Sequence, residues 1–253
     1  MPATVIPVKG LYLGFVGNIS NEGYSLRTAR LVEPTDTLSL AFGETAVLNS
    51  DNTYSSLASF LSKGLGTFTA STPLGLAASN VNINPTYAIT GSEDVLTPGG
   101  VYLPSAMADV LVQGTINVVA QNGTPVAGGS VYVRTALNAA LTGAVVGGLE
   151  AAVDPNPATP TITTTASSTS ATVSSATGLT VGMLITSTNV VPGTFIAAIS
   201  GTTITLSTAA TASGSATAAT FTSNVLYPNF KWKTGYLETD LTAQVTILQR
   251  TIA

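Results

Sequence analysis

The chain has 253 residues, of which 8% are charged, and its formal net charge is -4. Cysteine and histidine are both absent, which excludes disulfides and thiolate metal sites and removes the usual general base near neutral pH. The lysines and arginines form no dense run, so the sequence argues against nucleic acid as a partner.

No uninterrupted apolar stretch reaches the roughly 18 residues that a membrane-spanning helix needs. The first residues, MPATVIPVKGLYLGF, lack the basic region and the continuous apolar region of a signal peptide. We therefore expect a protein that is made in a cytoplasm and has no membrane as its partner.

The first fifty residues contain short apolar runs separated by turn residues, and this pattern predicts the strands TVIPV, LYLGFVG, LSLAFG and TAVLN. The following stretch, DNTYSSLASFLSKG, predicts a short helix that Asp51 or Asn52 caps and that Gly64 ends. We expect its apolar face, with Leu57, Phe60 and Leu61, to point inward.

Residues 81–136 are more regular and predict four strands, VNINPTYAIT, GGVYLPS, ADVLVQGTINVVA and GSVYVRTAL. Between the last two strands, the pair Asn122-Gly123 indicates a turn. In the third strand, apolar Ile116 and Val118 alternate with polar neighbours, as in a strand with one buried face.

Residues 155–223 carry no charge and are rich in threonine, serine and alanine. The runs GMLITST, TFIAAIS and TTITLST are typical of strands, and the pair Ser200-Gly201 predicts a hairpin turn between the last two. Linker-like PNPATP and TAATFTS flank them. We therefore expect a small β-sandwich module here, and not a disordered segment.

Residues 224–253 return to ordinary composition. Phe230, Trp232 and Tyr236 are candidate packing anchors. The run TAQVTILQRT places Val245 and Ile247 on one face of a final strand. The flanks of the neutral segment thus look like two parts of one domain.

Four elements, in order, carry a resemblance to a known family: GTPVAGGSVYVR at 123–134, GGLEAAVD at 147–154, LYPNFKWKTGY at 226–236 and AQVTIL at 243–248. They resemble the C-terminal part of the structural cement, or decoration, proteins of tailed-bacteriophage capsids. A polar stretch at 16–31 is compatible with an early arm of that family. The neutral segment is similar to a Thr/Gly-rich β-module of phage virion proteins.

The resemblance implies an all-β fold with a β-barrel or sandwich-like core and a small β-sandwich inserted in a C-terminal loop. The predicted core is discontinuous, with residues 1–154 and 224–253, and the Ig-like module spans 155–223. Insertion at a loop with adjacent ends is favoured because loop closure costs little extra free energy as the loop lengthens.

The resemblance also implies a virion protein that decorates and stabilises the mature phage head, as a trimer at threefold or quasi-threefold sites. Its expected partners are the major capsid protein and other copies of itself. Its expected location is the outer surface of the head, with the module projecting outward. Neither an enzymatic activity, a metal nor a cofactor is expected.

Seven residues are candidates for contacts with partners. Arg27, Arg30 and Arg134 would reach acidic surfaces of a neighbour, or else be ordinary exposed strand residues with buried stems. Trp232 is a candidate core or interface anchor. An N-terminal arm with Val5, Ile6 and Val8 would add a strand to a capsid subunit.

Other functions stay open on the sequence alone. A tail tube or tip protein also fits a low-charge β-rich chain. A host-surface adhesin would bind glycans through the module, with Phe195 or Phe221 stacking on sugar rings. Carboxylate pairs at 93–94 and 238/240 permit a hydrolase, but solvated charges explain them better. The loop NSDNT at 49–53 offers oxygen ligands for calcium, and a simple turn or cap explains it better.

Overall fold

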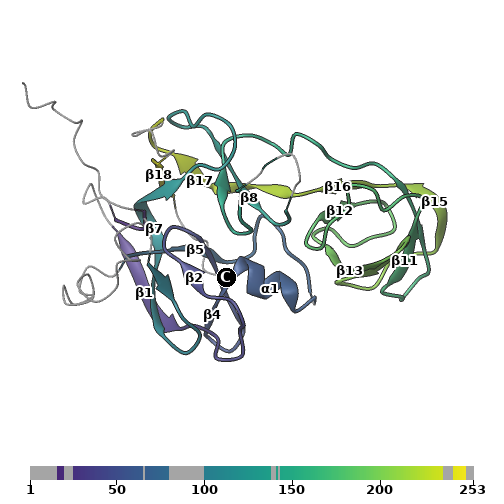
Figure 1. Ribbon diagram of the computed structural model, residues 1–253, viewed down its shortest axis with the longest axis horizontal. Coiled ribbons are helices and arrows are strands. Elements are labelled where there is room, and N and C mark those ends of the chain that lie inside the picture. The colour runs from purple at the N-terminus through teal and green to yellow at the C-terminus, as the bar shows by residue number, and fades with distance from the viewer. Residues whose placement is uncertain are drawn as a thin grey trace, which may run out of the picture.

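The computed structural model describes residues 16–19, 25–64, 66–79, 100–137, 141, 143–235 and 242–248. The described part is almost entirely β-structure, as predicted, with one short helix among its elements. The molecule is elongated, with a curled sheet at one end and a smaller group of strands at the other (Figure 1). The predicted strands TVIPV and VNINPTYAIT, and the anchor Tyr236, lie outside the described residues.

A nine-stranded antiparallel sheet forms the core, in the order β4-β3-β5-β7-β18-β17-β8-β9, with β1 also paired to β7. Its strands are β1 (Leu26–Leu31), β3 (Thr45–Leu48), β4 (Tyr54–Ser56), β5 (Leu74–Ala77), β7 (Met107–Val119), β8 (Ser130–Arg134), β9 (Leu149–Glu150), β17 (Asn224–Trp232) and β18 (Thr242–Ile247). A separate ladder joins β2 (Leu40–Ala41) to β6 (Val101–Tyr102). The C-terminal strands therefore lie in the middle of the sheet.

Strand β7 is the longest strand and pairs with β1, β5 and β18. The predicted alternation of one buried and one exposed face is wrong for its second half, because Thr115 and Asn117 are buried along with Ile116 and Val118. The buried amide of Asn117 accepts a hydrogen bond from Gln244 of β18 at 3.1 Å. The Thr115 hydroxyl likewise bonds to that of Thr246 at 3.0 Å, so the buried polar side chains of β7 are satisfied across the sheet.

The predicted helix is present as α1 (Leu57–Ser62), but its cap differs from the prediction. The side chain of Ser56 accepts a hydrogen bond from the Ser59 N–H, so Ser56 is the N-cap. Leu57 and Leu61 are buried as expected. The N–H of Gly64 donates to the carbonyl of Leu61, with φ at +65°, and closes the end of the helix.

Seven strands form the module: β10 (Thr161–Thr164), β11 (Ser170–Val173), β12 (Leu184–Thr186), β13 (Ile196–Ser200), β14 (Thr203–Leu206), β15 (Gly214–Ala218) and β16 (Thr220–Thr222). They make a sheet in the order β13-β14-β11-β10-β15 and the pair β12-β16. The predicted hairpin at Ser200-Gly201 is confirmed, with Ser200 opposite Thr203.

A chain connection on one side and hydrogen bonds on the other join the two sheets of the module into a ring. Strand β15 leads into β16 through a single residue, and β16 pairs with β12. The chain beside β12 then bonds to the chain at β13, where Ile185 donates to Thr194 and Ile196 donates to Met183. The ring encloses its own apolar cluster, which includes Ile162, Ile204 and Phe221. Closure leaves few unpaired strand edges.

Candidate functional site

Arg27 and Arg30 lie on β1, a strand with mostly exposed or half-buried side chains. The Arg27 side chain is 53% exposed, and its Nη1 lies 2.9 Å from Oδ2 of Asp109. The Nη1 of Arg30 donates a long hydrogen bond of 3.5 Å to the Asn52 carbonyl. Arg27 therefore remains a candidate for a contact with another protein, because an exposed ion pair of this kind is weak. Arg30 is half-buried and lies on the opposite face of β1, which makes it the weaker candidate.

An exposed apolar patch, formed by Leu31, Leu103 and Met107, lies at the end of the same strand. Leu31 is directly opposite Met107 in the β1–β7 ladder. A tight turn, in which the Ala106 N–H donates to the Leu103 carbonyl, brings Leu103 to this end of the ladder. The exposed fractions are 37% for Leu31, 62% for Leu103 and 59% for Met107. Grouped exposed apolar side chains of this kind are typical of interaction surfaces.

Arg134 does not lie on the surface. Its side chain and that of Glu150 are both 0% exposed, and the two form an ion pair between β8 and β9. The Nη1 of Arg134 also donates to the Ala136 carbonyl at 3.2 Å. The sequence allowed two roles for Arg134, a contact with a partner or an ordinary exposed strand residue. A side chain that is fully buried in its own chain fits neither role. We therefore do not retain it as a contact.

The buried pair belongs to a polar network that we call the neck, with Arg134, Glu150, Asp154, Ser223 and Asn224 as its members. The amide of Asn224 donates to Oε2 of Glu150 at 2.6 Å. The Asp154 carboxylate accepts from the Ser223 N–H at 2.6 Å, and the Asp154 N–H donates to Oδ1 of Asn224 at 3.0 Å. The neck thus fixes residue 154, where the charged sequence stops, beside residue 223, where the chain returns to the core.

Trp232 is also buried, in the core cluster with Phe230 and Val245. Of the two roles that the sequence allowed, core anchor or interface anchor, its position is that of a core anchor. The N-terminal residues Val5, Ile6 and Val8 lie outside the described residues. The glycan-stacking candidates Phe195 and Phe221 are both fully buried, so neither offers its ring face to a sugar.

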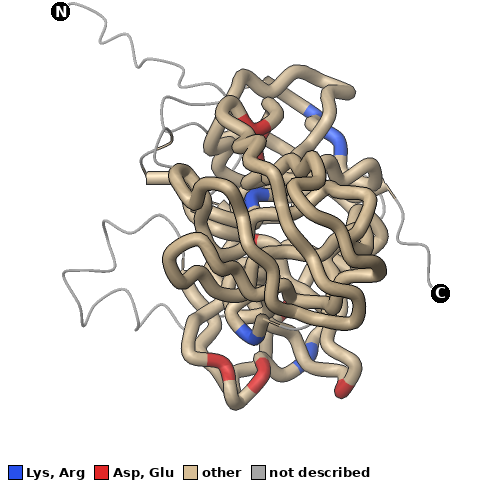
Figure 2. Tube along the Cα trace, turned by 90° about the vertical axis from the view of Figure 1, so that its right-hand side faces the viewer, with Lys and Arg blue, Asp and Glu red and all other residues tan. Residues whose placement is uncertain are grey.

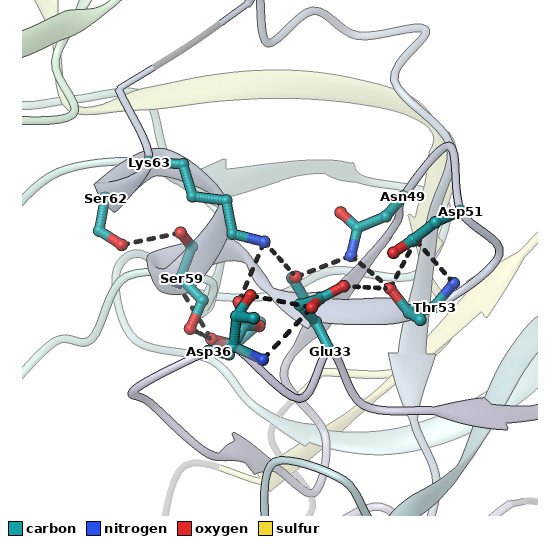
Figure 3. A network of polar contacts seen from close by, with 11 residues as sticks. Glu33, Asp36, Asn49, Asp51, Thr53, Ser59, Ser62 and Lys63 are labelled. Atoms are coloured by element: carbon teal, nitrogen blue, oxygen red, sulfur yellow. Dashed lines mark hydrogen bonds and ion pairs between the residues drawn. The ribbon is translucent and has the colours of Figure 1, made fainter.

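A second polar network links Glu33, Asp36 and the loop at 49–53 to α1 and Lys63 (Figure 3). Lys63, after the helix, lies 3.0 Å from the buried carboxylate of Asp36. The Thr53 hydroxyl lies 2.9 Å from Oε2 of Glu33 and 2.7 Å from Oδ1 of Asp51, and its one proton is available to either carboxylate. Hydrogen bonds from the Thr53 hydroxyl and the Thr53 N–H lower the pKa of Asp51. These contacts explain the loop at 49–53 as an ordered turn, as expected.

The described residues hold no group of three or more acidic side chains suited to a metal ion. The carboxylate pairs at 93–94 and 238/240 lie outside the described residues, so the structure does not bear on them. In the part of the chain that the structure describes, no helix has the length and apolar character needed to cross a membrane.

Replacing Glu44 by glutamine should change how stability depends on pH. Burial raises the pKa of Glu44 above its ordinary value of 4.5, although a hydrogen bond from the Ala41 N–H opposes the shift. The native state therefore holds the proton more tightly than the unfolded state, and this carboxyl makes stability fall as pH rises above about 4.5. Urea midpoints between about pH 4 and pH 7 should show that fall in the wild type and less of it in Glu44→Gln.

Asp51→Asn provides the comparison of opposite sign. The pKa of Asp51 is lowered, so its contribution is present above the ordinary value of 3.8 and is lost as pH falls. Identical pH profiles for the wild type and Glu44→Gln would contradict the expected role of Glu44.

The fold is that of a β-rich protein with exposed apolar side chains at one end of β1 and a charge-free segment at 155–223. Residues 6–181 match the model of the XM1 gp53 minor capsid protein family. This match covers about seven tenths of the chain, and the protein belongs to that family. The comparison with curated proteins found no match.

The family identifies the chain as a structural component of a phage capsid that associates with other capsid proteins. The matched range includes the first two of the four elements on which the sequence resemblance depends, at 123–134 and 147–154. It also continues into the module as far as residue 181. The two C-terminal elements, at 226–236 and 243–248, lie beyond it.

Proposed function

We propose that the protein binds the outer surface of the mature phage head, with its core toward the shell and its module pointing away. The observation that carries this orientation is the uneven distribution of charge. No charged residue occurs between Asp154 and Lys231, so every charge belongs to the core. The module end of the molecule is uncharged when viewed directly (Figure 2).

The contact region would combine the apolar patch of Leu31, Leu103 and Met107 with Arg27, which lies on the same face of β1 as Leu31. Apolar side chains at the centre of an interface supply most of the affinity, while charges at its rim set orientation and association rate. Arg27 can exchange its exposed partner Asp109 for a carboxylate of a shell subunit at little cost. The partner that fits is therefore a shell protein with an apolar surface and acidic groups beside it.

Stabilisation would follow from mass action. A protein that binds the mature lattice and not its precursor adds its binding free energy to the mature state. Many copies on one shell give a large total effect without any single tight contact. A trimer at threefold positions, as the resemblance implies, would add contacts between copies. The N-terminal residues Val5, Ile6 and Val8 remain a proposed strand-forming arm.

The proposed division into a core of residues 1–154 and 224–253 and an inserted module of 155–223 has two supports. The module has its own apolar cluster, to which Ala136 is the one contributor from outside 155–223 among the buried members. The neck holds residues 154 and 223 together, as an insertion into a loop requires.

The double substitution Leu31→Asp with Met107→Asp tests the contact region. Both side chains are exposed, so the fold should persist, but two carboxylates would have to be desolvated at the shell. We expect at least about a tenfold weaker binding to heads that lack the protein, which corresponds to about 1.4 kcal/mol. Quantifying bound copies on purified heads over a concentration series measures the change.

Val181→Asp is the matched control, since Val181 is 47% exposed on the module. Its binding should equal that of the wild type. Equal binding of the double variant and the wild type would show that the shell contacts another part of the molecule.

A further inference from the structure

The core and the module also meet through a second set of contacts, made by other segments of the chain than those of the neck. We call this contact the seam, formed by Gly66 and Phe68 of the core with Gly193, Ser207 and Thr208 of the module. The Phe68 N–H donates to the Gly193 carbonyl at 2.8 Å. The Gly66 N–H donates to the Ser207 carbonyl at 3.2 Å, and the Thr208 hydroxyl donates to the Gly66 carbonyl at 2.8 Å.

An apolar contact lies behind these hydrogen bonds. Phe68 and Phe195 are both 0% exposed and belong to the same buried cluster, together with Leu184 of the module. Phe195 is itself held by Ser207, whose N–H donates to the Phe195 carbonyl and whose hydroxyl accepts from the Phe195 N–H. The core cluster therefore extends across the seam into the module.

The neck is a separate attachment of different construction. Strand β16 of the module ends at Thr222 and β17 of the core begins at Asn224, so the chain passes from module to core through the single residue Ser223. The Thr135 N–H donates to the Ser223 carbonyl at 2.8 Å, and the Thr180 hydroxyl donates to the Leu137 carbonyl at 2.8 Å. Ala136 of the core is also buried in the module's cluster. Without the seam, these contacts would be the described attachment about which the module could bend.

We propose that the seam is a latch that fixes the angle between module and core, so that the two move as one rigid body. Two attachments made by different segments restrict the bending that one would allow. A module held in one direction loses less conformational entropy when it meets a partner. Opening the seam would let the module swing about the neck while both parts stay folded. This inference depends on contacts within one chain and is independent of binding to the head.

Two glycines of the module allow a matched test. Gly193 has φ of +85°, and a Cβ on it would lie 2.5 Å from Cγ2 of Thr69 and 2.7 Å from the Phe68 carbonyl oxygen. Gly201 has φ of +61°, and nothing lies within 4 Å of its Cβ position. An alanine causes comparable backbone strain at both positions, but it collides with the core at Gly193 alone.

The experiment compares Gly193→Ala, Gly201→Ala and the wild type as full chains, by amide hydrogen exchange and ¹⁵N relaxation. In Gly193→Ala we expect the Phe68 amide to exchange at least about tenfold faster and the module to tumble faster than the core. In Gly201→Ala and the wild type, one correlation time should describe both parts. A single correlation time and an unchanged Phe68 amide in Gly193→Ala would overturn the proposal.

Phe68→Ala covers the case in which Gly193→Ala unfolds the module. This substitution removes the apolar anchor from the core side and changes no residue of the module. The amides of Ile162 and Ile204, inside the module's own cluster, should stay protected while the module tumbles independently. A module that remains fixed to the core in Phe68→Ala would also overturn the proposal.

Discussion

Glu150→Ala is expected to lower the free energy of unfolding by about 3–5 kcal/mol, because it leaves the buried Arg134 without its carboxylate partner. Both side chains are fully buried, so water cannot replace the lost partner. The substitution also removes the acceptor for the amide of Asn224. Urea or guanidinium unfolding of the purified variant, followed by circular dichroism, measures the loss.

Two further variants separate this charge effect from general damage. Arg27→Ala breaks an ion pair whose arginine is half exposed, and it should cost less than about 1 kcal/mol. The double variant Arg134→Met with Glu150→Leu removes both charges and should be more stable than Glu150→Ala. If Glu150→Ala cost no more than Arg27→Ala, the buried pair would not hold β8 and β9 together.

Deleting residues 157–222 is expected to leave a core that still unfolds cooperatively but is less stable by about 2–3 kcal/mol. The neck would remain, because Asp154, Ser223 and Asn224 all lie outside the deletion. The loss comes from Phe68, which is buried against the module and would become exposed to water. Unfolding curves from fluorescence and circular dichroism should coincide for the deletion variant.

Phe68→Ser in the deletion background is the matched variant, since it removes the newly exposed ring. It should be more soluble than the simple deletion at similar stability. Loss of cooperative unfolding in both deletion variants would contradict a core that folds without the module.

Local patterns in the sequence predicted much of the module and part of the core. The hairpin at Ser200-Gly201 follows from a turn pair between two alternating strands, and this information is contained in residues 196–206. The helix α1 was also predictable, although Ser56 caps it in place of Asp51 or Asn52. Asp51 and Asn52 belong to the turn before β4. The Asp51 carboxylate accepts hydrogen bonds from Thr53 in that turn and not from the helix.

Long-range pairing could not be predicted in the same way. The turn at Asn122-Gly123 is real, with Gly123 at φ of +75°, but the strands on either side of it are not neighbours. The C-terminal strands β18 and β17 lie between β7 and β8. No local signal in one sequence specifies which distant strand enters a sheet, because alternation is the same for every partner.

The burial of a single charged side chain could not be predicted from local sequence either. Arg27, Arg30 and Arg134 each occupy a strand with alternating side chains, yet the first is half exposed and the last is buried. The difference depends on Glu150, sixteen positions after Arg134, and on Asn224, which comes from the other end of the chain. The sequence offered one indication of this ion pair: Glu150 stands between apolar Leu149 and Ala151 in a chain with few charges.

Immunogold electron microscopy of intact virions, with antibody raised against residues 157–222, tests the proposed role most directly. We expect label distributed over the surface of the heads, since the module would point away from the shell. Label confined to the tails would contradict it and favour a tail component. Absence of label on both heads and tails of particles that contain the protein would also contradict it, because the module would then be covered in the virion.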